Sequence, residues 1–139
     1  MKDIISHTKK SVFSLEKNAI YESALEIFTL SRKLTQQACN TSKNNNLLYP
    51  EEIHLTEQIT QTSLSIPFSI AQATVTNDYI KKLAFQNTIY NRITLLKKAY
   101  SRLKNISRKK TRDIYLMEKA INKFENKFEN WSTAITRQN

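Results

Sequence analysis

The 139-residue sequence contains no glycine, two prolines and one cysteine. Glycine supplies the positive φ angles and close backbone approach that β-hairpins, phosphate-cradling loops and dinucleotide-binding folds use. Its absence therefore argues against those classes and predicts helices joined by short polar turns. The single thiol, Cys39, cannot form an internal disulfide, and the chain opens on no signal-like leader. We therefore expect a reducing, cytoplasmic location.

Long apolar runs are also missing from the sequence. None approaches the ~20 residues that a helix needs to cross a bilayer. We therefore expect one soluble domain over residues 1–139, without a membrane partner.

Acidic residues are scarce in one quarter of the chain. Residues 77–112 contain eleven Lys or Arg and one acid, Asp78, for a net charge of +10, while the remaining residues balance to zero. Surfaces held by salt bridges intersperse the two signs, and this segment does not. A field of this kind attracts a phosphate-bearing polymer. The competing interpretation is a lysine-rich solvated surface that reflects a biased genome.

Apolar residues recur at spacings of three and four in four segments, which is typical of amphipathic helices. The spacing predicts helices over 14–39, 50–75, 77–105 and 108–136, with residues 1–13 frayed. We expect the polar tract 40–46 to end the first helix, Pro50 to open the second, and Ser107 to cap the fourth. These segments predict an all-α, antiparallel up-down four-helix bundle whose second helix is kinked at Pro67. A break at Pro67, giving five shorter helices, is the alternative.

Residues suited to catalysis are few. The two histidines are His7, near the N-terminus, and His54, which has glutamates beside it at helical spacing. A Glu-x-x-His step occurs in di-metal bundles, but those sites need inward carboxylates on the other helices, and the glutamates here fall mainly on polar faces. We therefore expect no enzyme, no catalytic residue, no metal and no cofactor.

The basic segment is the stronger candidate for a site. Its predicted nucleic-acid-binding residues lie on the third helix, in the turn after it and at the start of the fourth: Arg92, Lys97, Lys98, Arg102, Lys104, Arg108, Lys109, Lys110 and Arg112. Cations at the start of a helix oppose its dipole, at a cost of roughly 0.3–1 kcal/mol each. Their placement favours an anionic ligand, RNA or complementary DNA, bound with weak sequence specificity. We expect Tyr79, Tyr90 and Tyr115 to pack within the bundle rather than stack on bases.

Two stretches of the chain resemble known protein families. Residues 64–72, which read Leu-Ser-Ile-Pro-Phe-Ser-Ile-Ala-Gln, resemble a motif of the four-helix-bundle proteins encoded in ribosomal RNA intervening sequences. Gln72 replaces the usual acid of that motif. Residues 79–135 resemble the C-terminal half of the accessory variability determinant of diversity-generating retroelements. The shared features are a long basic helix, a short turn with a serine, and a lone tryptophan, here Trp131, with Asn130 in place of a frequent glycine.

The second resemblance implies a homopentamer of four-helix bundles that associates with a reverse transcriptase and its template RNA. It also implies a basic surface, which Arg92, Lys97, Lys98 and Arg102 match in kind. We therefore expect a non-enzymatic accessory protein that binds nucleic acid and a reverse transcriptase. Apolar residues in excess of one core also favour an oligomer: Leu25, Phe28, Leu83 and Leu116.

Two other interpretations remain open from the sequence. The first is an adaptor of the intervening-sequence type, whose basic patch binds an acidic protein rather than nucleic acid. The second is peripheral binding to anionic membranes, which we disfavour because the basic side lacks exposed apolar residues for insertion.

Overall fold

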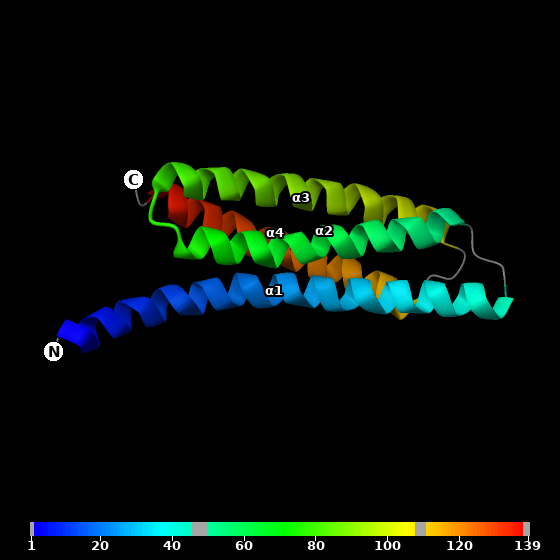
Figure 1. Ribbon diagram of the computed structural model, residues 1–139, viewed down its shortest axis with the longest axis horizontal. Coiled ribbons are helices and arrows are strands. Elements are labelled where there is room, and N and C mark those ends of the chain that lie inside the picture. The colour runs from blue at the N-terminus through cyan, green and yellow to red at the C-terminus, as the bar shows by residue number, and fades with distance from the viewer. Residues whose placement is uncertain (1, 46–49, 108–110, 138–139) are drawn as a thin grey trace.

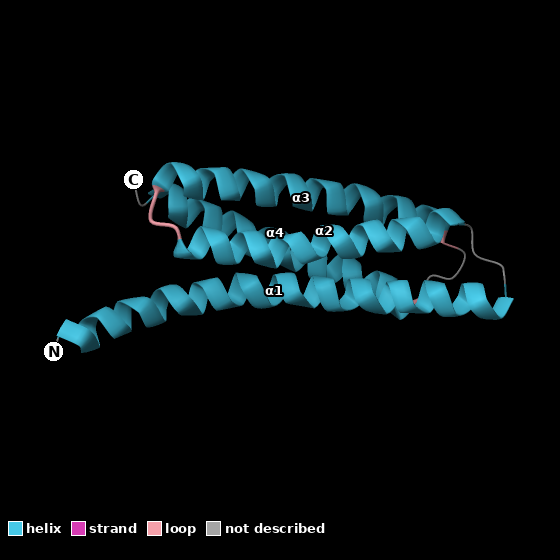
Figure 2. Ribbon diagram, in the orientation of Figure 1, coloured by secondary structure: helices cyan, strands magenta, loops and turns pink. Residues whose placement is uncertain are grey.

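The protein is described by a computed structural model that covers the backbone of residues 2–45, 50–107 and 111–137 and the side chains of 19–40, 50–107 and 111–137. Four helices make up this structure: α1 (Lys2–Asn45), α2 (Pro50–Val75), α3 (Tyr79–Ile106) and α4 (Arg112–Arg137). The described ranges contain no strand, as Figure 2 also shows. The prediction of an all-α chain of four helices is confirmed.

The four helices form a ring in which each packs against two neighbours. α1 contacts α2 and α4, and α3 contacts α2 and α4, whereas the diagonal pairs do not meet. In Figure 1 the chain passes along α1, returns along α2, passes along α3 and returns along α4. α3 and α4 approach each other least closely of the four neighbouring pairs.

α1 is longer than the sequence pattern predicts. It begins at Lys2 rather than near Ser14 and continues to Asn45, through most of the tract that we expected to end it. No glycine or proline occurs before Pro50. The asparagines and serine of the tract each cost less than about 0.7 kcal/mol in a helix, which is too little to stop one. In Figure 1 the first part of α1 extends beyond the other three helices.

α2 is one helix and contains Pro67 in its interior. The alternative of a break into two pieces is therefore wrong. Its start follows the expected chemistry, because Pro50 is the first helical residue and Glu51 and Glu52 occupy the first turn. Acids there complement the positive end of the helix dipole.

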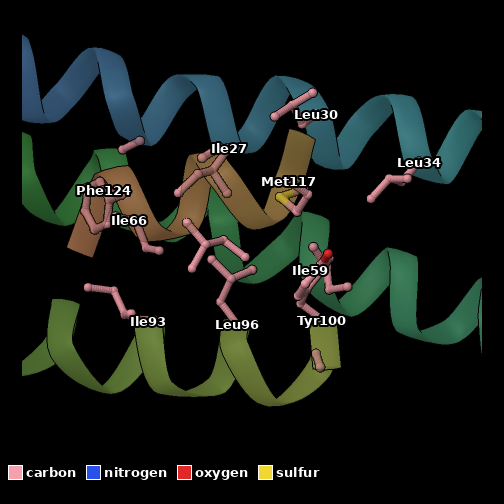
Figure 3. Close-up of a cluster of buried hydrophobic side chains, with 14 of the residues drawn as sticks. Ile27, Leu30, Leu34, Ile59, Ile66, Ile93, Leu96, Tyr100, Met117 and Phe124 are labelled. Atoms are coloured by element: carbon pink, nitrogen blue, oxygen red, sulfur yellow. The ribbon is translucent and has the colours of Figure 1, made fainter. Parts of the chain in front are cut away.

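The core runs along the centre of the ring and receives side chains from every helix. Figure 3 shows Ile27, Ile59, Leu96 and Phe124, one from each helix, pointing into this centre. The predicted stripe of α4 is buried at Ile114, Met117, Ile121, Phe124, Phe128 and Ile135, with Trp131 packed partly buried against it. Burial of each large apolar side chain contributes roughly 1.5–3 kcal/mol.

Five hydroxyl side chains lie where α1 meets α2, and we call this set the hydroxyl ladder: Ser31, Thr35, Thr56, Thr60 and Ser63. The Ser63 hydroxyl donates to Ser31 Oγ at 3.0 Å and lies within 2.7 Å of the Ile59 carbonyl. Thr35 and Thr60 share a hydrogen bond of 2.8 Å. Each of these hydroxyls also reaches a backbone carbonyl. Hydroxyls satisfied in this way allow two helices to approach closely without an unpaired polar group.

In the described part of the chain, no helix is both long and apolar enough to span a membrane.

Candidate nucleic-acid interface

α3 is the basic helix of the bundle. The carboxylate of Asp78 caps its start by accepting a hydrogen bond from the Ile80 amide at 3.0 Å, and Ser107 caps its end. Between these caps the helix carries seven cations and no acid: Lys81, Lys82, Arg92, Lys97, Lys98, Arg102 and Lys104. Its apolar side, from Ile89 to Leu103, is buried against α2 and α4. The cations are therefore left on the flanks and the outer side of α3.

Three predicted site residues form ion pairs with glutamates of neighbouring helices. Lys97 lies 3.1 Å from Glu125 and Lys104 lies 3.1 Å from Glu118, both on α4. Arg102 Nε lies 2.8 Å from Glu51 on α2. The expectation that this segment is free of salt bridges is wrong, because the acids come from helices distant in sequence.

These ion pairs leave the basic character of the surface in place. Every side chain in them remains at least 31% exposed, and exposed pairs contribute only about 0–1 kcal/mol to stability. Phosphate can therefore compete for the same cations at small cost. The three glutamates offset three of the ten excess charges of residues 77–112, so seven remain.

Two other predicted residues of α3, Arg92 and Lys98, are exposed and have no acidic partner among the described residues. Arg112 is exposed at the first position of α4. Arg108, Lys109 and Lys110 lie outside the described residues. The cations of α3 thus extend from its α2 flank, at Arg102, to its α4 flank, at Lys97 and Lys104.

The start of α4 differs from its prediction. The helix begins at Arg112, so Ser107 does not cap it and instead ends α3, donating its backbone N–H to the Leu103 carbonyl at 2.9 Å. The first turn of α4 holds Arg112 beside Asp113, which has the charge that the dipole favours. Only Arg112 opposes the dipole in that turn, so the argument for an anion at this helix start is weaker than the sequence suggested.

Two tyrosines are more exposed than predicted. Tyr90 on α3 is 60% exposed and Tyr115 on α4 is 49% exposed, whereas Tyr79 is half-buried. The expectation that all three pack within the bundle is therefore wrong for Tyr90 and Tyr115. A helical projection could have predicted the exposure of Tyr90, because it places this residue about 100° around the helix from the buried Ile89. Exposed rings beside cations are the combination that single-stranded nucleic acids bind.

Tyr100 closes the seam between α3 and α4. Its hydroxyl donates a hydrogen bond of 2.6 Å to the Ile114 carbonyl. Burial, with smaller contributions from the charges of Glu118 and Tyr115, raises the pKa of Tyr100 to about 12. A surface pocket of about 190 Å³ lies beside it and includes Lys97 and Lys104 in its lining.

The residues considered for a metal do not converge. Glu51 pairs with Arg102, His54 is exposed, and Glu52 is buried. No group of three or more His, Cys, Asp or Glu side chains in the described ranges is placed to hold a metal ion.

Comparison with known proteins adds no relative: no protein-family model, no curated protein and no solved structure matches this chain. The resemblance to the intervening-sequence and retroelement families therefore stays a prediction from the motifs quoted above.

Proposed function

We propose that this protein is a non-enzymatic accessory factor that binds single-stranded nucleic acid along α3. The observation that carries the proposal is a helix with seven cations and no acid, whose apolar side is buried and whose cations are exposed or only weakly paired. Its electrostatic contacts would follow the phosphate backbone, with little sequence specificity.

We also propose the partners that the resemblance implies, a reverse transcriptase and further copies of this chain in a pentamer. Each subunit would be an antiparallel up-down four-helix bundle with a bend in α2 at Pro67. Two ion pairs support opposite directions of α3 and α4, because the later lysine of α3, Lys104, meets the earlier Glu118 of α4, while Lys97 meets Glu125. The proposed association with a reverse transcriptase is tested by the gene neighbourhood: a reverse-transcriptase gene should lie beside the gene of this protein.

Nucleic-acid binding is tested by titrating single-stranded RNA at several salt concentrations. If about six phosphates are neutralised, log affinity falls against log salt with a slope near −4. Replacing Arg92 and Lys98 by glutamate should make this slope shallower by roughly 1 to 2, since two phosphate contacts are lost. We choose these two because, unlike Lys97 and Arg102, they have no glutamate beside them among the described residues.

The matched control replaces Lys33 on α1 and Lys119 on α4 by glutamate, because both are exposed. This variant has the same net charge as the α3 variant but an unchanged α3. It should keep the wild-type slope. Absence of salt-dependent binding by the wild type, or equal slopes for the two variants, would overturn the proposal.

One observation favours a second candidate, an adaptor for an acidic protein. Three cations of α3 already pair with carboxylates of neighbouring helices: Lys97, Arg102 and Lys104. Carboxylates of another protein would therefore suit the same surface. This candidate predicts that RNA does not bind, while an acidic partner binds the wild type and not the Arg92 and Lys98 variant.

A further inference from the structure

The seam between α3 and α4 has a regular repeat. Lys104 pairs with Glu118, and seven residues away on each helix Lys97 pairs with Glu125. Continuing by seven residues in the same directions brings Tyr90 opposite Ser132. These two side chains cannot form an ion pair. At this third position of the repeat, α3 and α4 are therefore not joined by a salt bridge.

A pocket lies at this third position. Its volume is about 370 Å³, and its lining is Leu83, Gln86, Asn87, Tyr90 and Phe128. Phe128 is buried, whereas Tyr90 is largely exposed. The volume is within the range of small-molecule sites, about 300–1,000 Å³.

Polar atoms in and near the pocket lack partners. Gln86 Oε1 is buried and has no hydrogen bond among the described residues. The same holds for the hydroxyl of Ser132, which lies one turn after Phe128 on α4. Both oxygens are closed off from solvent, so they lie behind the wall of the pocket and do not face a ligand in it.

We propose that this pocket binds one unstacked base of a single-stranded nucleic acid. A base is flat and aromatic, so it can stack on the exposed ring of Tyr90. An anion would find no cation in the lining. Lys97 follows seven residues after Tyr90, about 10 Å along the same flank, where it can contact an adjoining phosphate.

The pocket should also select among the bases. Adenine presents two fused rings to Tyr90 and uracil presents one, so stacking should favour adenine over uracil. This inference rests on the proposed function, because the base reaches the pocket as part of a strand held by α3.

The experiment compares oligoadenylate and oligouridylate of equal length, with deoxyoligoadenylate to distinguish RNA from DNA. Tyr90→Leu should weaken oligoadenylate binding by about fivefold or more, the usual effect of losing one stacking ring, with the salt slope unchanged. Tyr90→Phe keeps the ring and should bind like the wild type. Tyr90→Leu should also reduce the preference for adenine over uracil.

Tyr21→Leu is the matched control, because Tyr21 is an exposed tyrosine on α1, the helix diagonal to α3. It should leave binding unchanged. The fluorescence of Trp131, whose ring centroid is 6.0 Å from that of Phe128, should change on titration with oligoadenylate and not in the Tyr90→Leu variant.

The outcomes separate the two proposals. Salt-dependent binding that is equal in Tyr90→Leu and Tyr21→Leu would overturn the base pocket and leave the α3 interface standing. Equal affinity of the wild type for adenine and uracil would overturn the selectivity. Absence of any salt-dependent binding would overturn both proposals.

Discussion

Tyr100 joins the end of α3 to the start of α4 through its hydrogen bond to the Ile114 carbonyl. The phenol is buried, and its pKa is raised from 10.0 to about 12. Between these two values the unfolded chain releases the phenol proton while the folded chain retains it. The stabilisation is therefore complete below pH 10 and is lost as the pH rises towards 12.

The consequence is testable with Tyr100→Phe. The contribution of this group to the fall in wild-type stability across that range is on the order of 2–3 kcal/mol, and the variant should lack it. Below pH 10 the variant should be less stable by about 1 kcal/mol, because the Ile114 carbonyl loses its donor. Urea unfolding at a series of pH values measures both effects, with Tyr90→Phe as an exposed control. Parallel pH profiles for wild type and Tyr100→Phe would contradict this assignment.

At the scale of the helix, the hydroxyl ladder sets how α1 and α2 meet. Ser31 and Ser63 are both fully buried. The Ser31 hydroxyl donates to the Ile27 carbonyl, and Ser63 Oγ lies 3.0 Å from Ser31 Oγ and 2.7 Å from the Ile59 carbonyl. Serine is among the smallest side chains, so the two backbones can come close at this point. The ladder therefore fixes one register of the α1–α2 pair.

Ser63→Leu should disrupt this interface. The larger side chain has no space to occupy, and overpacking of a closely packed interior costs typically 1–3 kcal/mol. Ser31 also loses its donor at Oγ. The urea midpoint measures the loss, and Gln61→Leu, an exposed position on the same helix, is the control. Equal midpoints for the two variants would show that the ladder is not closely packed.

The stripes of each helix were predictable because burial follows a 3.6-residue period within one segment. Ile89, Ile93 and Leu96 are buried as that period predicts. The ends of α1 were not, since no glycine or proline marks them and asparagine alone is a weak stop signal. The partners of Lys97 and Arg102 were not predictable either, because they depend on the register between different helices. The exposure of Tyr90 could have been predicted, because a helical projection places it away from the buried stripe of α3.

At the scale of the whole molecule, α2 presents an apolar stripe to the outside, formed by Leu64, Phe68 and Val75. These side chains are 55%, 66% and 78% exposed. α2 contains no Lys or Arg, so two copies of this helix can meet without bringing cations together. Of the residues that the sequence suggested for contacts between copies, Leu25 and Leu83 are each 37% exposed, and Phe28 and Leu116 are half-buried.

The proposed oligomer should therefore depend on α2. Light scattering at micromolar concentration should give a mass of several copies of the 16.2 kDa chain, with five copies expected from the resemblance. Replacing Leu64 and Phe68 by serine should lower the mass, whereas Tyr115→Ser on α4 should not. A wild-type mass of one chain would contradict the oligomer, and an unchanged mass in the double variant would exclude this stripe as its interface.

The length of α3 limits how many nucleotides one copy of the protein can contact. Lys81 and Lys104 lie 23 residues apart, which is roughly 35 Å along a helix. A stacked strand that rises about 3.4 Å per nucleotide would cover this distance with about ten nucleotides. Shorter strands would leave part of the helix unused, and longer strands would have room for additional copies of the protein side by side.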